Sequence, residues 1–141
     1  MALPYYDSFY GSPERMFFEN GREGLQCNRG LHAGDPMATT FFCLAMQGPL
    51  LYACESVPGV QAQAYIDDVA ITGHYSDVAD FVQVFSQQLF SLGLSVNCDK
   101  SSICGRSAKM TEVTWCSQQN AAGLVYMGLP FGSAIFVEDG L

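Results

Sequence analysis

The sequence predicts an α+β domain in which helices cover one face of an antiparallel sheet. Apolar residues repeat at helical spacing in two long segments, and short runs of strand-forming residues lie between and after them. Helices and strands in such an irregular order are typical of α+β domains. The chain has 141 residues, of which 49% are hydrophobic, and this is enough to bury the core of one domain.

Residues 1–30 are rich in turn signals that separate short aromatic runs. Gly11-Ser12-Pro13 is one such signal, and Asn20-Gly21 is another. Because Asn-Gly favours the tight turn of a β-hairpin, we expect a pair of strands in this part of the chain.

The first helix is predicted to open at Asp35-Pro36, since Asp caps free amides and Pro is tolerated at the first helical position. The residues that follow are apolar on nearly all sides, which predicts a buried helix. They are Phe41, Phe42, Leu44, Ala45 and Met46. Gly48-Pro49 is expected to kink or end the helix. It also interrupts the apolar run, and since a membrane span needs about 20 mostly apolar residues, we expect none.

A β-hairpin is predicted next, because two short segments of strand-forming residues, 61–65 and 69–72, flank Ile66-Asp67-Asp68. A second helix follows, with Ser76 as its cap and Asp77 at the positive end of its dipole. Its apolar residues recur every three or four positions and so form one face. They are Val78, Phe81, Val82, Phe85, Leu89 and Leu92.

Gly93 is expected to end this helix in a left-handed turn. Residues 94–97 are then predicted to form a strand, and residues 101–105 a strand or turn. Residues 124–137 contain two apolar runs separated by Pro130 and Gly132, which predicts a final strand pair.

Composition limits the function classes. The net charge is −8 with six Lys and Arg residues, which argues against a free-standing nucleic-acid binder. Charged residues make up 14%, against roughly 25% in soluble domains, so we expect further protein to cover some of the surface, unless the chain is a poorly soluble monomer.

The six cysteines form no zinc-binding spacing and no secretory signal follows Met1. These features predict free thiols in an intracellular protein of the nucleus or cytoplasm.

Asp67 and Asp68 are the first candidates for chemistry. Adjacent strand residues point to opposite faces, so the two acids share a ligand only if the backbone turns beside them. Their apolar neighbours place them at the rim of a core, where charge is costly unless a hydrogen bond or metal neutralises it. Mg²⁺ prefers carboxylate oxygens and is often held by one or two of them together with substrate phosphates. The alternative is an ordinary hairpin turn, in which Asp is common.

Five blocks of the sequence, in the family order and at plausible separations, resemble the signature blocks of reverse transcriptases. They are residues 9–15, 30–36, 65–68, 93–101 and 126–132. The first and last of them resemble the non-LTR retrotransposon enzymes in particular. The resemblance implies part of a polymerase palm with a C-terminal hairpin like a primer grip, and the activity of an RNA-directed DNA polymerase, a nucleotidyltransferase. RNA template, DNA primer and dNTP are the implied partners.

The same resemblance implies roles for individual residues. Asp67 would be a direct ligand of the catalytic Mg²⁺ ions and Asp68 would complete the acidic pair. Gly34, Asp35 and Pro36 would form the corner that approaches the incoming nucleotide and template, where a helix N-terminus favours phosphate.

Two further sites are implied, each with an ordinary structural alternative. Lys100 would neutralise or protonate the pyrophosphate; the alternative is a solvated lysine in a turn. The primer end would be held by Gly128, Leu129, Pro130 and Gly132, since glycine permits close backbone contact. The alternative is an ordinary tight hairpin.

The chain departs from the family pattern in two places. Ala33 stands where the family often has glutamine or another polar residue, and the block that carries another metal-binding aspartate would precede residue 1. Asp7 is not expected to replace that aspartate, because it lies among proline and aromatic residues. Residues 1–141 are therefore predicted to be a single partial palm without fingers, thumb or first aspartate block. An isolated palm is also expected to be acidic, because fingers and thumb carry most of the family's basic surface.

Such a partial palm is expected to be inactive alone. Its unpaired strand edges would favour self-association. Two other interpretations stay open: a non-catalytic retroelement remnant or binding and assembly module, and an unrelated α+β domain whose Asp67-Asp68 is a simple turn.

Overall fold

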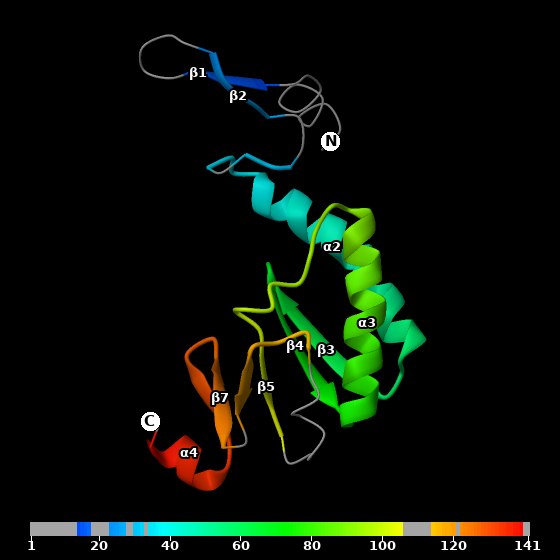
Figure 1. Ribbon diagram of the computed structural model, residues 1–141, viewed down its shortest axis with the longest axis vertical. Coiled ribbons are helices and arrows are strands. Elements are labelled where there is room, and N and C mark those ends of the chain that lie inside the picture. The colour runs from blue at the N-terminus through cyan, green and yellow to red at the C-terminus, as the bar shows by residue number, and fades with distance from the viewer. Residues whose placement is uncertain are drawn as a thin grey trace. The chain divides into compact units, whose positions relative to one another are not determined.

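The computed structural model describes residues 14–17, 23–27, 30–32, 34–105, 114–120 and 122–139. The chain divides into two compact units, Met1–Phe41 and Phe42–Leu141, and each is described by itself. Helices and small, mainly antiparallel sheets follow one another in mixed order, as in an α+β fold (Figure 1). In the described part of the chain, no helix combines the length and hydrophobicity required to cross a membrane.

The described residues of the first unit include an antiparallel strand pair, β1 (Glu14–Phe17) and β2 (Glu23–Cys27), with an irregular register between Arg15 and Phe17. The predicted strand pair is therefore confirmed. The Gly11-Ser12-Pro13 and Asn20-Gly21 turn signals lie outside the described residues, as do Asp7 and Ala33.

Helix α2 (Ala38–Ser56) continues through Pro49, so the prediction that Gly48-Pro49 could end the helix is wrong. Proline lacks an N–H and leaves the Ala45 carbonyl without its helical partner. Because Ala45 is exposed, water can bond that carbonyl. The prediction of a buried helix is also wrong: Met46 and Ala53 are its buried residues.

Strands β3 (Val60–Tyr65) and β4 (Asp68–Gly73) form the predicted hairpin, with Ala62 paired to Ile71 and Tyr65 paired to Asp68. Alternate residues share a face of the sheet. One face packs against the hydrophobic core through Val60, Ala62, Val69 and Ile71.

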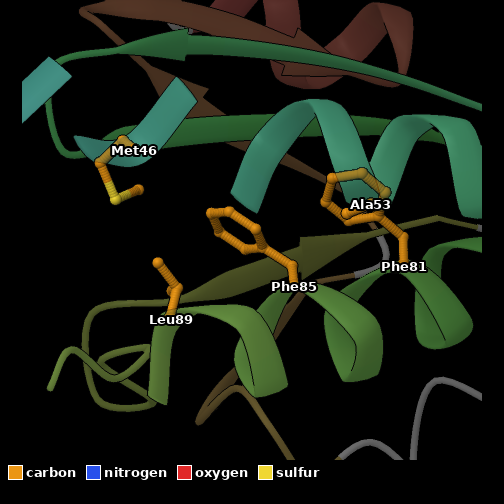
Figure 2. Packing of buried hydrophobic residues seen from close by; sticks show 5 residues of the cluster. All are labelled: Met46, Ala53, Phe81, Phe85 and Leu89. Carbon is orange, nitrogen blue, oxygen red and sulfur yellow. The ribbon is translucent and has the colours of Figure 1, made fainter. Parts of the chain in front are cut away.

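Helix α3 (Tyr75–Ser91) supplies most of that core. Phe81, Phe85 and Leu89 project from α3 toward Met46 and Ala53 of α2, as Figure 2 shows. Phe81 is fully buried, and its ring centroid lies 5.7 Å from that of Phe85. The predicted apolar face is confirmed at Phe81, Val82, Phe85 and Leu89, which are buried. Its first member, Val78, is half-buried and its last, Leu92, is 46% exposed.

The N-cap predicted for α3 is wrong, whereas the predicted C-terminal end is confirmed. Ser76 is not the cap: His74 occupies that position without a side-chain cap, and the Ser76 hydroxyl is hydrogen-bonded instead to His74 Nδ1 and Asp77 Oδ1. Asp77 lies in the first turn as predicted. At the C-terminus Gly93 has a φ of +75°, and Leu94 N donates to Leu89 O at 3.0 Å. This is a Schellman ending, so the predicted left-handed stop is confirmed.

The segment after α3 differs from the expected strand at residues 94–97. Residues 94–97 have no regular secondary structure, and Leu94 and Val96 pack against the core. Strand β5 (Ser102–Cys104) confirms the expectation for residues 101–105, but it pairs in parallel with β6 (Gln118–Asn120). In the described part of the chain the strands form separate two-stranded sheets, and the β5–β6 sheet is parallel while the others are antiparallel.

The last segment forms strands β7 (Gly123–Tyr126) and β8 (Leu129–Gly132) and helix α4 (Ala134–Asp139), which contacts β8. A strand pair is present as predicted, but it lies within residues 123–132 with its break at Met127-Gly128. The apolar run after Gly132, which was expected to be its second strand, forms α4 instead. Pro130 and Gly132 lie within β8 and do not separate the strands.

Candidate active site

The Asp67-Asp68 pair lies at the tip of the β3–β4 hairpin. Tyr65 pairs with Asp68, so Ile66 and Asp67 are the two central residues of the turn. Ile66 has a φ of +56°, and it and Met127 are the non-glycine residues with positive φ in the described part of the chain. A positive φ at the first central residue alone is the pattern of a type II′ turn, which usually has glycine there.

Ile66 is a strained position, because a β-branched residue is an outlier in the left-handed region. Such strain costs about 1–3 kcal/mol and persists where the surrounding structure enforces it. Here the enforcement comes from the complete register of six paired residues on each side of the turn, from Val60 opposite Gly73 to Tyr65 opposite Asp68.

The hairpin turns Asp68 away from the helices. Tyr65 and Asp68 form one cross-strand pair, and Gln63 with Ala70 and Gln61 with Thr72 continue the same face. This face is opposite to the one that packs on the core. Apart from the half-buried Ala70, its members are exposed, and the Thr72 hydroxyl donates to Gln61 O at 3.5 Å. We call these six residues the open face.

Both carboxylates are exposed, which corrects the expectation that they lie at the rim of a core. Burial therefore does not oblige the pair to bind a metal. Neither carboxylate has an ion pair or hydrogen bond with another residue in the described part of the chain. Among the described residues, no group of three or more acidic, histidine or cysteine side chains could hold a metal ion. Two carboxylates at one turn still suit Mg²⁺ in the mode where substrate phosphates supply further ligands.

Gly34, Asp35 and Pro36 lie in the first unit, at the entrance to α2. Met37 N donates to Asp35 Oδ1 at 2.9 Å and Ala38 N donates to Asp35 O at 3.1 Å. Gly34 has a φ of +91°. The predicted capping role of Asp35 is confirmed, with the regular helix starting three residues later. This geometry serves the helix whether or not a nucleotide approaches it.

Lys100 lies in an exposed turn between α3 and β5. Its backbone N–H donates to Asn97 O and to Asn97 Oδ1, both at 3.3 Å, and Asp99 N donates to the same Oδ1 at 3.1 Å. The Asn97 side chain therefore fixes the backbone of the turn. Lys100 itself is exposed to solvent.

The C-terminal hairpin turns at Met127 and Gly128, with φ values of +51° and +80°. Positive φ at both central residues is the type I′ pattern. Leu129 is 59% exposed and Pro130 is half-buried. Gly132 lies opposite Gly123, where a Cβ would collide with the Ala122 carbonyl oxygen and Gly123 Cα. Gly132 is thus required by the hairpin itself.

Of the predicted site residues, the structure brings Asp67 and Asp68 together at one turn. Lys100 and the residues from Gly128 to Gly132 lie in separate turns and strands of the second unit. Sequence reasoning missed the strain at Ile66 and the open face. The polar alternation of Gln61 and Gln63 was the available signal for that face.

A family model described as reverse transcriptase (RNA-dependent DNA polymerase) matches residues 1–134. Comparison with curated proteins and with solved structures gave no match.

Proposed function

Since the chain belongs to the reverse transcriptase family, which the match over residues 1–134 shows, we propose that Asp67 and Asp68 are metal-binding carboxylates of an RNA-directed DNA polymerase palm. The observation that supports this most is the position of both acids at the tip of a strained hairpin. One face of that hairpin is covered by helices and the other is open. A turn that served only as a connection would be expected to carry Gly, Asn or Asp at the position of Ile66.

Mg²⁺ would be held by the Asp67 and Asp68 carboxylates. When bound, it would lower the pKa of the attacking hydroxyl and stabilise charge on the leaving pyrophosphate. The chain's own contribution is positional: the complete β3–β4 register fixes both acids at one end of the open face. Gln61, Gln63 and Thr72 give that face neutral polar side chains, along which a nucleic-acid strand can lie without meeting a further carboxylate.

The other site residues keep their roles as parts of this proposal. Lys100 has an exposed side chain on a fixed turn and would neutralise the pyrophosphate. Asp35, with its neighbours Gly34 and Pro36, shapes the entrance to α2 and would lie near nucleotide and template. The β7–β8 turn would contact the primer end. The resemblance of residues 9–15 and 126–132 to non-LTR enzymes supports that subtype. The free cysteines of the described residues support the nucleus or cytoplasm as the compartment.

Residues 1–141 would not extend a primer by themselves. Phosphoryl transfer depends on metal ions and substrates held in position, and the described residues offer two carboxylates at the turn and no larger metal-binding group. The measurement is primer extension on a primed RNA template with Mg²⁺. Template-dependent product above that of an Asp67→Ala control would contradict this part of the proposal.

Metal binding tests the site without requiring activity. Mn²⁺ added to the chain, as a paramagnetic substitute for Mg²⁺, should broaden the backbone NMR signals of residues 65–68 before others. Asp67→Asn and Asp68→Asn should each weaken this broadening. Asp80→Asn is the matched control, because Asp80 is an exposed acid on α3. Broadening that is unchanged in both turn variants would refute the assignment.

A non-catalytic assembly module is the second candidate, and the exposed apolar residues of the helices favour it. Leu44, Leu51 and Tyr52 of α2 are 58%, 52% and 53% exposed, and Phe90 of α3 is 82% exposed. Size-exclusion chromatography with light scattering measures the association. We expect Leu51→Glu to dissociate any oligomer, and Gln87→Glu, a change at an exposed polar position of α3, to leave it intact. A monomer at all concentrations would eliminate this candidate.

A further inference from the structure

Two cysteines far apart in sequence lie close together after α3. Cys98 is exposed in the turn that carries Lys100, and Cys116 is buried just before β6. Ser117 N donates to Cys98 O at 2.9 Å, and the Ser117 hydroxyl donates to Asp99 O at 3.2 Å. These bonds join the residue that follows Cys116 to two successive backbone carbonyls, those of Cys98 and Asp99.

The bond from Ser117 N to Cys98 O limits the separation of the two cysteines. Given standard peptide dimensions, it sets their α-carbons roughly 5–7 Å apart. A disulfide usually spans about 4.4–6.8 Å between α-carbons, so the backbone is suitably placed for one. The sulfurs make long contacts only, Cys98 Sγ with Val96 O at 3.9 Å and Cys116 Sγ with Gln118 O at 3.7 Å. Rotation of either side chain therefore breaks only one weak sulfur–oxygen contact and costs little free energy.

We propose that Cys98 and Cys116 form a thiol-modification site that reacts with a small-molecule disulfide, such as oxidised glutathione, to give an intramolecular disulfide. Cys98 reacts first because it is exposed. Its thiolate attacks one sulfur of the glutathione disulfide, and the electron pair of the broken S–S bond leaves with one glutathione. The Cys116 thiolate then attacks the Cys98 sulfur and expels the second glutathione. Two protein thiols are oxidised, one glutathione disulfide is reduced, and the two thiol protons pass to the two glutathiones.

The electrostatics of the pair agree with this order. Burial raises the pKa of the Cys116 thiol, and the charge of a neighbouring Cys98 thiolate raises it further, against a smaller lowering by a backbone hydrogen bond at Gln118. Cys116 is therefore a poor initial nucleophile and is better suited to the second, intramolecular step, where its proximity to Cys98 compensates. The product would hold the Lys100 turn against Ser117. The site does not depend on the metal-binding role of Asp67 and Asp68.

The test is to incubate the reduced full chain with oxidised glutathione and to map the linked peptides by mass spectrometry. Trypsin, which cleaves after Lys100, Arg106 and Lys109, places Cys98, Cys104 and Cys116 in three different peptides, and a second protease that cleaves before Asp80 separates Cys98 from Cys43 and Cys54. We expect the Cys98–Cys116 link to exceed the Cys98–Cys104 link by roughly tenfold, because the folded backbone presets the first pair. In urea, the shorter loop to Cys104 should instead be favoured.

Variants identify the two steps. Cys116→Ser should accumulate a glutathionyl group on Cys98, and Cys98→Ser should abolish the link. Cys43→Ser is the matched control, because Cys43 is an exposed thiol on α2, and it should behave as the unaltered chain. The mapping uses the unaltered chain, so the test stands even if a variant fails to fold. A persistent glutathionyl group on Cys98 without the link, or equal link ratios with and without urea, would overturn the proposal.

Discussion

The two hairpins of the second unit, β3–β4 and β7–β8, have the same construction and are stabilised in different ways. Each is an antiparallel pair joined by a two-residue turn. The β3–β4 hairpin packs one face on the core of α2 and α3. The β7–β8 hairpin depends on the close approach of Gly123 and Gly132 and on contact with α4.

The two turns also differ in how well their residues suit a left-handed backbone. Met127-Gly128 places glycine at one of two left-handed positions, whereas Ile66-Asp67 places a β-branched residue at its left-handed position. The comparison teaches that packing elsewhere can maintain an unfavourable turn. Strain of this kind clusters at functional sites, and in this chain it occurs beside the acidic pair.

The largest expected effect comes from removing the core under the first hairpin. Phe81→Ala should destabilise the β3–β4 hairpin and its helices by about 3–5 kcal/mol, because a fully buried aromatic side chain leaves a cavity. Urea unfolding followed by circular dichroism measures the loss. Phe90→Ala is the matched control, since Phe90 is 82% exposed on the same helix, and it should change stability by less than about 0.5 kcal/mol. Equal losses in the two variants would mean that α3 does not pack as described.

The second effect is confined to the other hairpin. Gly132→Ala should destabilise β7–β8 by about 2–4 kcal/mol, because the new Cβ meets backbone atoms of Ala122 and Gly123 that cannot move aside. Hydrogen exchange of the β7 and β8 amides should rise while that of β3 and β4 stays unchanged. Gly128→Ala is the control: no atom lies near its Cβ, so only its left-handed backbone costs, about 1 kcal/mol. Exchange that rises equally in both hairpins would show that they are not separately stabilised.

The smallest effect tests the turns directly. Ile66→Gly should stabilise the chain by about 1 kcal/mol because it relieves the strain at a φ of +56°. Met127→Gly should gain only about half as much, because methionine is not β-branched. Thermal unfolding of the two variants provides the comparison. If Ile66→Gly destabilises the chain, the turn is not strained and its unusual residue needs another explanation.

Much of the local structure could be predicted from the sequence. The spacing of Phe81, Phe85 and Leu89 predicted the buried face of α3, and Gly93 predicted its end. These features depend on residues within a turn or two of one another, so the sequence carries them directly. The cap of α3 was misassigned to Ser76 because Ser76 and His74 both lie at the boundary and only the backbone path decides between them.

The sequence likewise predicted some features of the candidate site and not others. Tyr65-Ile66-Asp67-Asp68, together with the four other blocks, predicted the family that the match over residues 1–134 shows. It also located the acidic pair in a hairpin turn. The sequence could not tell that both carboxylates are exposed, since burial depends on which elements pack beside the turn.

By itself, the sequence determined the two long helices, the buried face of α3, the hairpin that carries Asp67 and Asp68, and the family. It did not determine the irregular segment at residues 94–97 or helix α4. Only the tertiary structure decided that α2 continues through Pro49, that β5 pairs in parallel with β6, and that Cys98 lies beside Cys116. The physical reason is the separation along the chain of the residues that interact. Periodicity, caps and turns act between residues a few positions apart, whereas burial, strand partners and contacts between remote residues depend on how the whole chain packs.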